Sequence, residues 1–330
     1  MIRSVYFTKD DQLKTDLSPI DIAFALQDHQ GLLWVDFEAN KPEEDEPILR
    51  KTFGFHPLAI DDALQETHLP KLDDWGQYLY LVLHAVTYDR KDGGHIDTME
   101  LDVFLGPGYV VTHHDASIDV IDHVWTSVQR DVRQLRNGAD HLLYRLLDEI
   151  AANYMPVVEL LDGEIDQVEA EIFDHPSPNT VERIFSLKRS VLYLRRIIAP
   201  QREVLNKLAR DDFDVVDEKA RIYYRDVYDH LVRLYDITEG ERDLVSGTLD
   251  TYLSVMNNRM NDIMKTLTII TTLFMPISFV ASFFGMNIFQ PATPLNVWTR
   301  LPAFLITLVL IFITPAGMFL WIRKRGWMKL

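Results

Sequence analysis

The side chains best suited to chemistry lie on one face of a single segment near the C-terminal end. With about 100° of rotation per helical residue, the positions within about 60° of Met264 are Thr268, Thr271, Met275, Ser278 and Ser282. Continued towards the N-terminus, the same face holds Asn261, Asn257 and Asp250. We call this face the polar stripe. Its hydroxyl, amide and carboxylate oxygens could line a water-filled path for cations.

Helix packing is the alternative interpretation of the polar stripe. Small hydroxyl residues let transmembrane helices approach each other closely, so the same spacing also suits a buried helix contact. A conducting path needs more than one helix, because a single helix encloses nothing. The pore interpretation therefore requires several copies of the chain around an axis.

The polar stripe runs into an apolar segment that predicts a membrane hairpin over residues 266–322. No charged side chain lies between Lys265 and Arg300, or between Arg300 and Arg323. Because about 20 apolar residues cross a bilayer, each interval holds one span, and residues 285–299 form the loop between them. Pro276 lies within the first span, where membrane helices tolerate proline.

Basic residues predict how the hairpin is oriented in the cell (inner or plasma) membrane. Arg259 and Lys265 precede the first span. Four basic residues follow the second span, Arg323, Lys324, Arg325 and Lys329. The loop between the spans offers only Arg300. Since positive charge stays on the cytoplasmic side, both chain ends are expected in the cytoplasm, with residues 323–330 as a basic tail.

Composition excludes several classes of function. The chain has 330 residues, and its 50 acidic and 33 basic side chains give a formal charge of −17. This charge argues against nucleic acid as a partner. The absence of cysteine excludes disulfides, thiolate metal sites and cysteine nucleophiles. The N-terminal residues contain no long apolar run, so we expect no cleaved signal peptide.

The first part of the chain, residues 1–135, reads as a cytoplasmic α/β domain. Short runs rich in valine, tyrosine and leucine, bounded by turn residues, predict strands at Ser4–Phe7, Leu32–Phe37, Leu79–Tyr88, Met99–Leu105 and Tyr109–His113. Between them, Ser18-Pro19, Pro42 and Pro57 each precede a helical pattern.

The remainder reads as helical, with one helix expected over Ile118–Leu135. Residues 136–216 predict a long antiparallel helical hairpin broken by prolines at 176 and 178. Residues 217–265 predict a stalk helix that runs without a break into the first span, as one helix from about 218 to 284. The fold class is therefore an α+β membrane protein with two C-terminal transmembrane helices.

Other residues that could do chemistry have no supporting pattern. The sequence lacks a phosphate-binding glycine loop, a nucleophile elbow and an HExxH motif, so we expect no enzyme. His113 and His114 end a predicted strand and should point to opposite faces, which favours structural roles. The carboxylates Asp61, Asp62, Asp148 and Asp226 lie on predicted helices, and spacing alone does not bring them together.

At Gly285-Met286-Asn287, after Met275-Pro276 and one span, the chain resembles the CorA family of divalent-cation (Mg²⁺/Co²⁺) channels. The resemblance covers nearly the whole chain. Further segments that are similar to the family occur in the same order at His56-Pro57-Leu58, Pro70-Lys71, Tyr88-Asp89, Tyr224–His230 and Leu267–Ile270.

This resemblance implies a homopentamer in which the first span of each subunit lines the pore. Gly285, Met286 and Asn287 would form the selectivity filter at the outer mouth. Mg²⁺ gives up its water reluctantly, so a ring of neutral Asn287 amides could hold the hydrated ion weakly enough for release. Most of the polar stripe matches the family's pore-lining positions, and Met264 and Leu267 would form a hydrophobic gate.

The resemblance also implies a regulatory role for Mg²⁺. Asp62 and Asp226, with Asp61 and Asp148 as a second set, match positions where the ion binds between subunits and holds the pore closed. Binding there would cancel the repulsion between carboxylates, and loss of the ion would let the subunits separate.

One departure from the family leaves the transported ion open. The family often carries an acidic residue shortly after the triplet, whereas residues 288–294 here are uncharged. Mg²⁺ is the expected ion, with Co²⁺ and Ni²⁺ as further candidates. A Zn²⁺ transporter of the ZntB branch, with proton coupling, is one alternative. A membrane-anchored sensor or scaffold, whose hairpin is only an anchor, is another.

Overall fold

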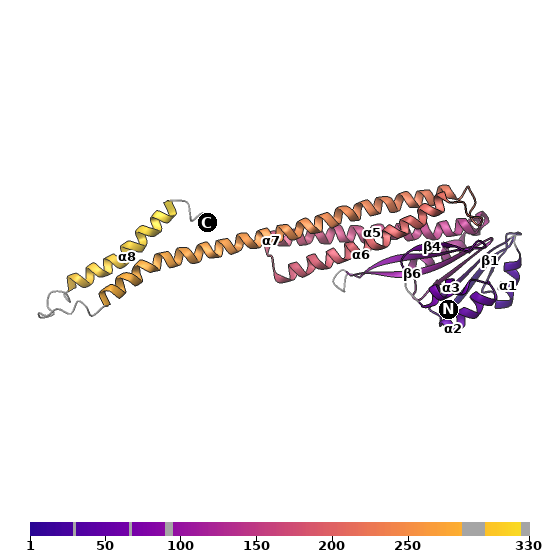
Figure 1. The fold of residues 1–330 in the computed structure, drawn as a ribbon, viewed down its shortest axis with the longest axis horizontal. Coiled ribbons are helices and arrows are strands. Elements are labelled where there is room, and N and C mark those ends of the chain that lie inside the picture. Colours follow the sequence, from indigo (N-terminus) through magenta and orange to yellow (C-terminus); the bar gives the residue numbers. More distant parts are fainter. Residues whose placement is uncertain (29–30, 66–67, 90–94, 286–300, 325–330) are drawn as a thin grey trace. The chain divides into compact units, whose positions relative to one another are not determined.

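The structure is a computed structural model in which two compact units are defined, Met1–Tyr252 and Leu253–Leu330. The residues described are 1–28, 31–65, 68–89, 95–285 and 301–324. Figure 1 shows the order of the elements along the chain. The first unit contains the sheet, the helices that cover it and the start of α7, and the second contains the rest of α7 together with α8.

The first unit is built on one seven-stranded sheet with the neighbour order β2-β1-β3-β7-β6-β5-β4. Among the strands that the structure describes, β3 and β7 are the one pair that runs parallel. The strands are β1 (Ile2–Phe7), β2 (Leu13–Thr15), β3 (Leu32–Glu38), β4 (Lys71–Asp74), β5 (Leu79–Asp89), β6 (His95–Gly106) and β7 (Tyr109–His114). All five expected strands are present, as β1, β3, β5, β6 and β7, whereas the edge strands β2 and β4 were not predicted.

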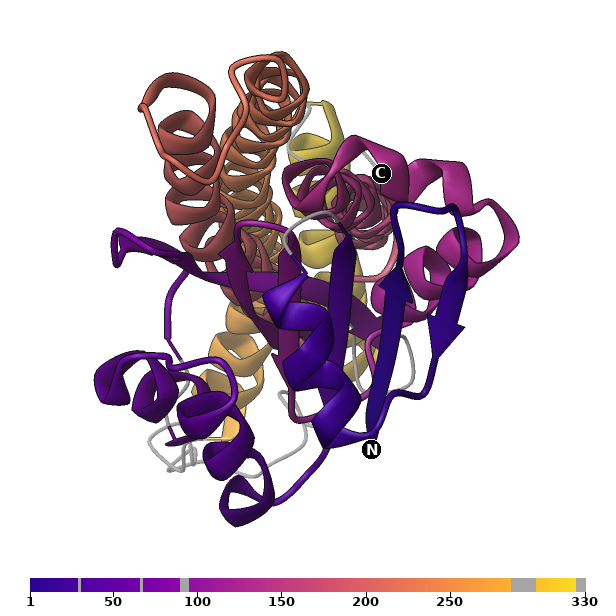
Figure 2. The ribbon, with the colours of Figure 1, turned by 90° about the vertical axis from the view of Figure 1, so that its right-hand side faces the viewer.

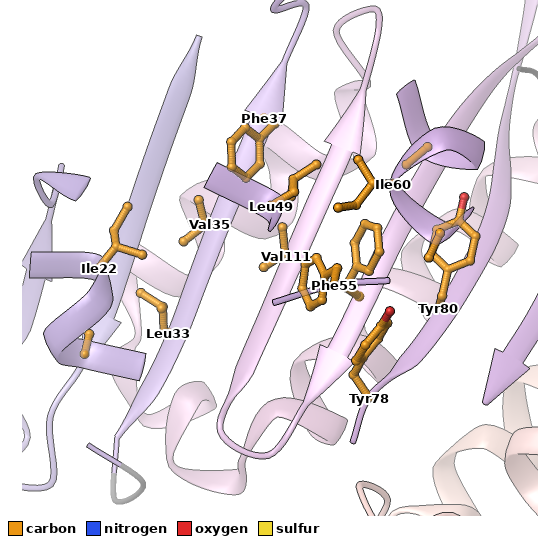
Figure 3. Close-up of a cluster of buried hydrophobic side chains, with 14 of the residues drawn as sticks. Ile22, Leu33, Val35, Phe37, Leu49, Phe55, Ile60, Tyr78, Tyr80 and Val111 are labelled. Carbon is orange, nitrogen blue, oxygen red and sulfur yellow. The ribbon is translucent and has the colours of Figure 1, made fainter. Parts of the chain in front are cut away.

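One face of the sheet is covered by three short helices. They are α1 (Pro19–Gln27), α2 (Pro42–Lys51) and α3 (Pro57–Gln65). Helix α1 begins where expected, because the Ser18 hydroxyl accepts the backbone N–H of Asp21. Apolar side chains of these helices, such as Leu49 and Ile60, pack with Phe104 and Val111 of the sheet in one buried cluster (Figure 3).

The opposite face is covered by α4 (Asp119–Arg130), α5 (Ala139–Asp174) and α6 (Pro178–Arg210), as Figure 2 shows. The prediction of one helix over Ile118–Leu135 was wrong. Helix α4 ends at Arg130, and a 3₁₀ turn, η2 (Val132–Asn137), follows it. The Asp131 side chain accepts the backbone N–H of Arg133. This hydrogen bond caps the start of η2 and favours a break between α4 and η2.

The predicted helical hairpin is present as α5 and α6, and it packs against the sheet. The Tyr154 hydroxyl of α5 donates to the His84 carbonyl at 2.9 Å. Gln201 Oε1 of α6 accepts the His84 backbone N–H at the same distance, 2.9 Å. The hairpin and the sheet therefore belong to one compact unit, together with the first part of α7, which runs beside α5 and α6 (Figure 1).

Helix α7 (Arg221–Gly285) is a single 65-residue helix, in agreement with the uninterrupted pattern expected for residues 218–284. Its last 33 residues lie in the second unit with α8 (Leu301–Lys324), a 24-residue helix. Pro276 is contained within α7. Within the described residues, two helices are long and apolar enough to cross a membrane, one in Arg221–Phe283 and one in Leu305–Lys324.

A buried ion-pair network ties β1 to β3 and β7, and we predict a large effect of breaking it. The Asp36 side chain is fully buried and accepts from Arg3 Nε at 2.7 Å, from the Thr112 hydroxyl and from a ring nitrogen of His114 at 3.2 Å. Asp36→Asn removes the buried carboxylate charge beside Arg3 and His114 and leaves Arg3 with only the partly exposed Asp122 as a counter-charge. It should lower the free energy of unfolding by about 3–5 kcal/mol, measured by chemical denaturation of the full chain.

The control is Asp122, which also pairs with Arg3, at 2.6 Å, but is 46% exposed. Asp122→Asn should change stability by about 1 kcal/mol or less, because exposed pairs contribute little. Equal destabilisation by the two substitutions would contradict the assignment of the stability to the buried carboxylate.

Candidate functional site

The polar stripe lies on the exposed surface of α7 throughout the described residues. Met264, Leu267 and Met275 are 58%, 62% and 67% exposed in the single chain. The remaining stripe positions are likewise exposed: Asp250, Asn257, Asn261, Thr268, Thr271, Ser278 and Ser282. The stripe is therefore available to lipid, water or another chain, and none of the described residues covers it.

Two hydroxyl groups of the stripe are oriented by the helix backbone. Thr268 Oγ1 donates to the Met264 carbonyl at 2.7 Å, and Thr271 Oγ1 donates to the Leu267 carbonyl at 2.9 Å. Each hydroxyl has one donor and two acceptor lone pairs. Because the hydrogen is committed to the backbone, each threonine presents acceptor oxygen outward, which is the polarity that a hydrated cation requires.

The first residue of the Gly-Met-Asn triplet is also the last described residue of α7. Gly285 is the last residue of the helix. Met286 and Asn287 lie outside the described residues, as does the loop expected between the spans. The selectivity filter therefore stays a prediction from the sequence.

Asp62, the first of the predicted regulatory carboxylates, already has a cationic partner. It lies on α3, and Lys71 Nζ of β4 donates to its Oδ2 at 2.5 Å. Lys71 also contacts Asp73 at 3.2 Å, and His68 Nε2 lies 3.7 Å from Asp62 Oδ1. A metal ion binding to Asp62 would have to compete with Lys71. Desolvation opposes the charge of Lys71, yet its two carboxylate neighbours raise its pKa, so it stays charged at neutral pH.

The other three carboxylates lie on different elements. Asp61 is exposed on α3 and accepts from Gln65 Nε2 at 2.7 Å. Asp148 lies on α5, 3.7 Å from Arg145, and Asp226 is exposed on α7. Burial raises the pKa of the Asp148 carboxyl, Arg145 opposes this, and the nearby charge of Asp226 raises it further.

Within one chain, the electrostatic neighbours of these carboxylates differ from the two pairs expected. After burial, Arg145 and Glu149, the charge of Asp226 also contributes, raising the pKa of Asp148. No interaction among the described residues joins Asp62 with Asp226, or Asp61 with Asp148. The predicted pairs would therefore need a second subunit, and their role stays a prediction.

Sequence reasoning missed the basic partners of these carboxylates. Lys71 was noted only as part of a family-like segment, and its contact with Asp62 depends on how β4 passes α3. Arg145 precedes Asp148 by three residues on the same helix. That spacing could have been found from the sequence, because residues three apart are neighbours on a helix.

Comparison with known proteins agrees with the architecture. Residues 29–324 match the family described as "CorA-like Mg2+ transporter protein". The chain is 33% identical to the "Putative metal ion transporter YfjQ" of Bacillus subtilis, covering 100% of this chain and 99% of that protein. It is 39% identical to the "Cobalt/magnesium transport protein CorA" of Thermotoga maritima, covering 71% of this chain and 67% of that protein.

Solved structures share the fold. The complete CorA magnesium transporter of Methanocaldococcus jannaschii superposes with a TM-score of 0.81 at 21% identity, covering 98% of each chain. The cytoplasmic domain of ZntB from Vibrio parahaemolyticus superposes less well, with a TM-score of 0.57 at 12% identity, covering 78% of this chain and 98% of that one. The matched residues include the sheet from β3 onward, both hairpin helices, α7 and α8. The chain therefore belongs to the CorA-like Mg²⁺ transporter family, whose members are membrane transporters and not enzymes.

Proposed function

We propose that this chain forms a homopentameric channel in the cell membrane that conducts Mg²⁺, with Co²⁺ and Ni²⁺ as further substrates. The observation that carries the proposal is the uninterrupted helix α7, which presents an exposed polar stripe through a segment apolar enough to span a membrane. Membership in a Mg²⁺ transporter family supports the ion. The relative from T. maritima is named as a cobalt and magnesium transport protein.

The chemistry of the stripe suits a hydrated divalent cation. Its threonines donate their hydroxyl hydrogens to backbone carbonyls and present acceptor oxygens, which can accept hydrogen bonds from the water shell of the ion. Neutral oxygens bind that shell weakly, and weak sequential binding is what conduction requires. At the outer mouth, a ring of Asn287 amides would select the hydrated ion without removing its water.

Several copies are needed because each α7 would form only one strip of the wall of the pore. Five chains around an axis would enclose the stripe and bury the exposed apolar side chains Met264 and Leu267. These two residues are three positions apart, so they occupy the same turn of the helix. A narrow ring of apolar side chains excludes water and closes a pore by dewetting.

Cytoplasmic Mg²⁺ is proposed to regulate the pore through carboxylates at subunit contacts. Among the described residues of one chain, no interaction joins Asp226 to Asp62, so an ion between them would need a neighbouring subunit and would have to compete with Lys71 for Asp62. An ion held between them would offset the repulsion between carboxylates and favour the closed assembly. Both chain ends are proposed to lie in the cytoplasm, as the distribution of basic residues indicates.

The contact between Lys71 and Asp62 predicts a sensitised variant. Lys71→Gln removes the cation that competes with Mg²⁺ for Asp62. The Mg²⁺ concentration that half-inhibits flux should therefore fall by roughly fivefold, equivalent to about 1 kcal/mol for a partly exposed pair. Flux into proteoliposomes at graded Mg²⁺ on the cytoplasmic side measures this. Lys51→Gln, at the exposed end of α2, is the matched control, and equal curves for both variants would contradict the competition.

The Zn²⁺ transporter is not favoured, because the matching family is described as one of Mg²⁺ transporters and the relative from T. maritima is named for cobalt and magnesium transport. The test of the proposal is ion flux by the full chain in proteoliposomes, with Mg²⁺ and Zn²⁺ compared with and without a pH gradient, and native mass spectrometry of the same preparation. Mg²⁺ flux without a gradient from a pentamer supports the proposal. Flux of Zn²⁺ alone, or flux only with a gradient, would support the transporter, and a folded assembly without flux would support the anchor.

A further inference from the structure

Two adjacent histidines at the end of β7 have very different surroundings. His114 is buried and both of its ring nitrogens have partners, the Ala116 carbonyl at 2.6 Å and Asp36 Oδ1 at 3.2 Å. His113 lies on the other face of the sheet and its side chain is only 3% exposed. Its Nδ1 is buried without a hydrogen-bond partner. Both ring nitrogens of His114 therefore have hydrogen-bond partners, whereas Nδ1 of His113 has none.

The carboxylates that face His113 are too distant to bond to it directly. Asp102 Oδ2 lies 3.8 Å from His113 Nδ1, and Asp45 Oδ2 lies 3.6 Å from His113 Nε2. Both separations exceed the length of a hydrogen bond. Asp102 and Asp45 are themselves buried. Buried polar groups usually have partners, so something is expected to fill the space between Asp102 and His113.

That space opens into a cavity of about 330 Å³ between the end of α3 and strands β6 and β7. Asp102 pairs with His113 across the two strands, and Glu100 lies two residues earlier on the same face of β6. Glu100 Oε1 is also buried without a hydrogen-bond partner, whereas Oε2 accepts the His68 backbone N–H at 2.8 Å. The wall of this cavity therefore carries two buried side-chain atoms that lack hydrogen-bond partners, one on His113 and one on Glu100.

We propose that this cavity binds a divalent transition-metal ion through His113 Nδ1 and Asp102 Oδ2, with Glu100 as a third ligand. Two atoms bound to one tetrahedral Zn²⁺ lie about 3.4 Å apart, close to the 3.8 Å observed here. In the described part of the chain, no group of three or more His, Cys, Asp or Glu side chains is placed so that it could hold a metal ion as it stands. Glu100 must therefore turn towards the ion, and water completes its coordination.

The groups behind the two ligands are of the kind that support a metal site. The Tyr80 hydroxyl donates to the other oxygen of Asp102 at 2.5 Å, which orients the carboxylate. Asp45 lies at the far nitrogen of His113, where a carboxylate favours the ring tautomer that ligates through Nδ1. An imidazole ligand selects Zn²⁺, Co²⁺ or Ni²⁺ over Mg²⁺. The site is thus distinct in chemistry from the all-oxygen stripe of α7.

Cobalt binding to the full chain in detergent tests this proposal and does not depend on transport. With Mg²⁺ in large excess to occupy the oxygen sites, Co²⁺ is titrated and followed by its visible absorption, and Zn²⁺ is added as competitor. The wild type should bind Co²⁺ that Zn²⁺ displaces. His113→Gln and Asp102→Asn should each weaken binding by about 10- to 100-fold. His123→Gln is the control, because His123 also faces a carboxylate, Glu149, but is 68% exposed.

Melting curves without metal show whether each variant is folded, and Asp102→Asn keeps the size of the side chain if His113→Gln does not fold. Zn²⁺ should raise the melting temperature of the wild type and of His123→Gln, but not of a folded Asp102→Asn. Equal Co²⁺ affinity in the wild type and Asp102→Asn would overturn the proposal. So would a wild type that binds no Co²⁺ in excess Mg²⁺, since ordered water alone would then fill the cavity.

Discussion

Asn287→Ala is expected to abolish Mg²⁺ flux while leaving the assembly intact. If five Asn287 amides hold the hydrated ion, alanine removes one oxygen acceptor from each subunit. Each hydrogen bond contributes on the order of 1 kcal/mol, so the loss in all subunits should lower flux by at least about tenfold.

Asn296→Ala is the matched control for this prediction. Asn296 is the other asparagine between the two spans, and no role in ion binding is assigned to it. Flux is measured with a fluorescent Mg²⁺ indicator inside proteoliposomes, and size-exclusion chromatography checks the assembly. If both variants conduct like the wild type, the triplet is not the filter. If both lose flux equally, the loop acts as a whole and the specific role of Asn287 is contradicted.

Leu267→Asn is expected to have the opposite effect, a pore that no longer closes. Leu267 is 62% exposed in the single chain and lies three residues after Met264, at the edge of the stripe, about 60° away. In a pentamer the substitution would place five amides where the apolar ring excludes water. The ring would then stay hydrated, and flux at inhibitory Mg²⁺ should rise on the order of tenfold, since opening by dewetting depends on apolar side chains.

Ile269→Asn is the control for the gate, because Ile269 is half-buried and lies about 140° from Met264 and about 160° from Leu267. It adds the same amide to α7 on the face opposite to the stripe. Flux at inhibitory Mg²⁺ should stay low in this variant. A similar rise in both variants would show that any polar residue in this part of the helix loosens the assembly, and would contradict a gate formed by Met264 and Leu267.

The long helices and the central strands could be predicted because their patterns are local. The run from residue 221 to 285 contains no break before Pro276, and one helix forms there. The edge strand β4 has the sequence Lys-Leu-Asp-Asp, which lacks the β-branched and aromatic residues typical of a strand. It forms because β5 offers a pairing edge over Lys71–Asp74, a tertiary effect that a local pattern does not contain.

The candidate sites likewise include features that local spacing predicts and features that only contacts between distant segments decide. Helical spacing alone groups the polar stripe, and the structure leaves those positions exposed together. The sequence places His113 and His114 on opposite faces, but it does not say which one has its partners. That difference arises from strand register, which sets Asp102 opposite His113, and from the position of Arg3 beside Asp36. Contacts between distant segments, such as Lys71 with Asp62, are likewise decided by the fold.

The most direct test of the central claim is a cysteine scan of α7, which is simple here because the chain contains no cysteine. Single cysteines are placed on the stripe at 264, 271, 275, 278 and 282 and off it at 263, 270 and 277, and a charged thiol reagent is added during Mg²⁺ flux. A pore lined by the stripe predicts block at the first set and continued flux at the second. Block without helical periodicity, or no block at any stripe position in a conducting protein, would contradict it.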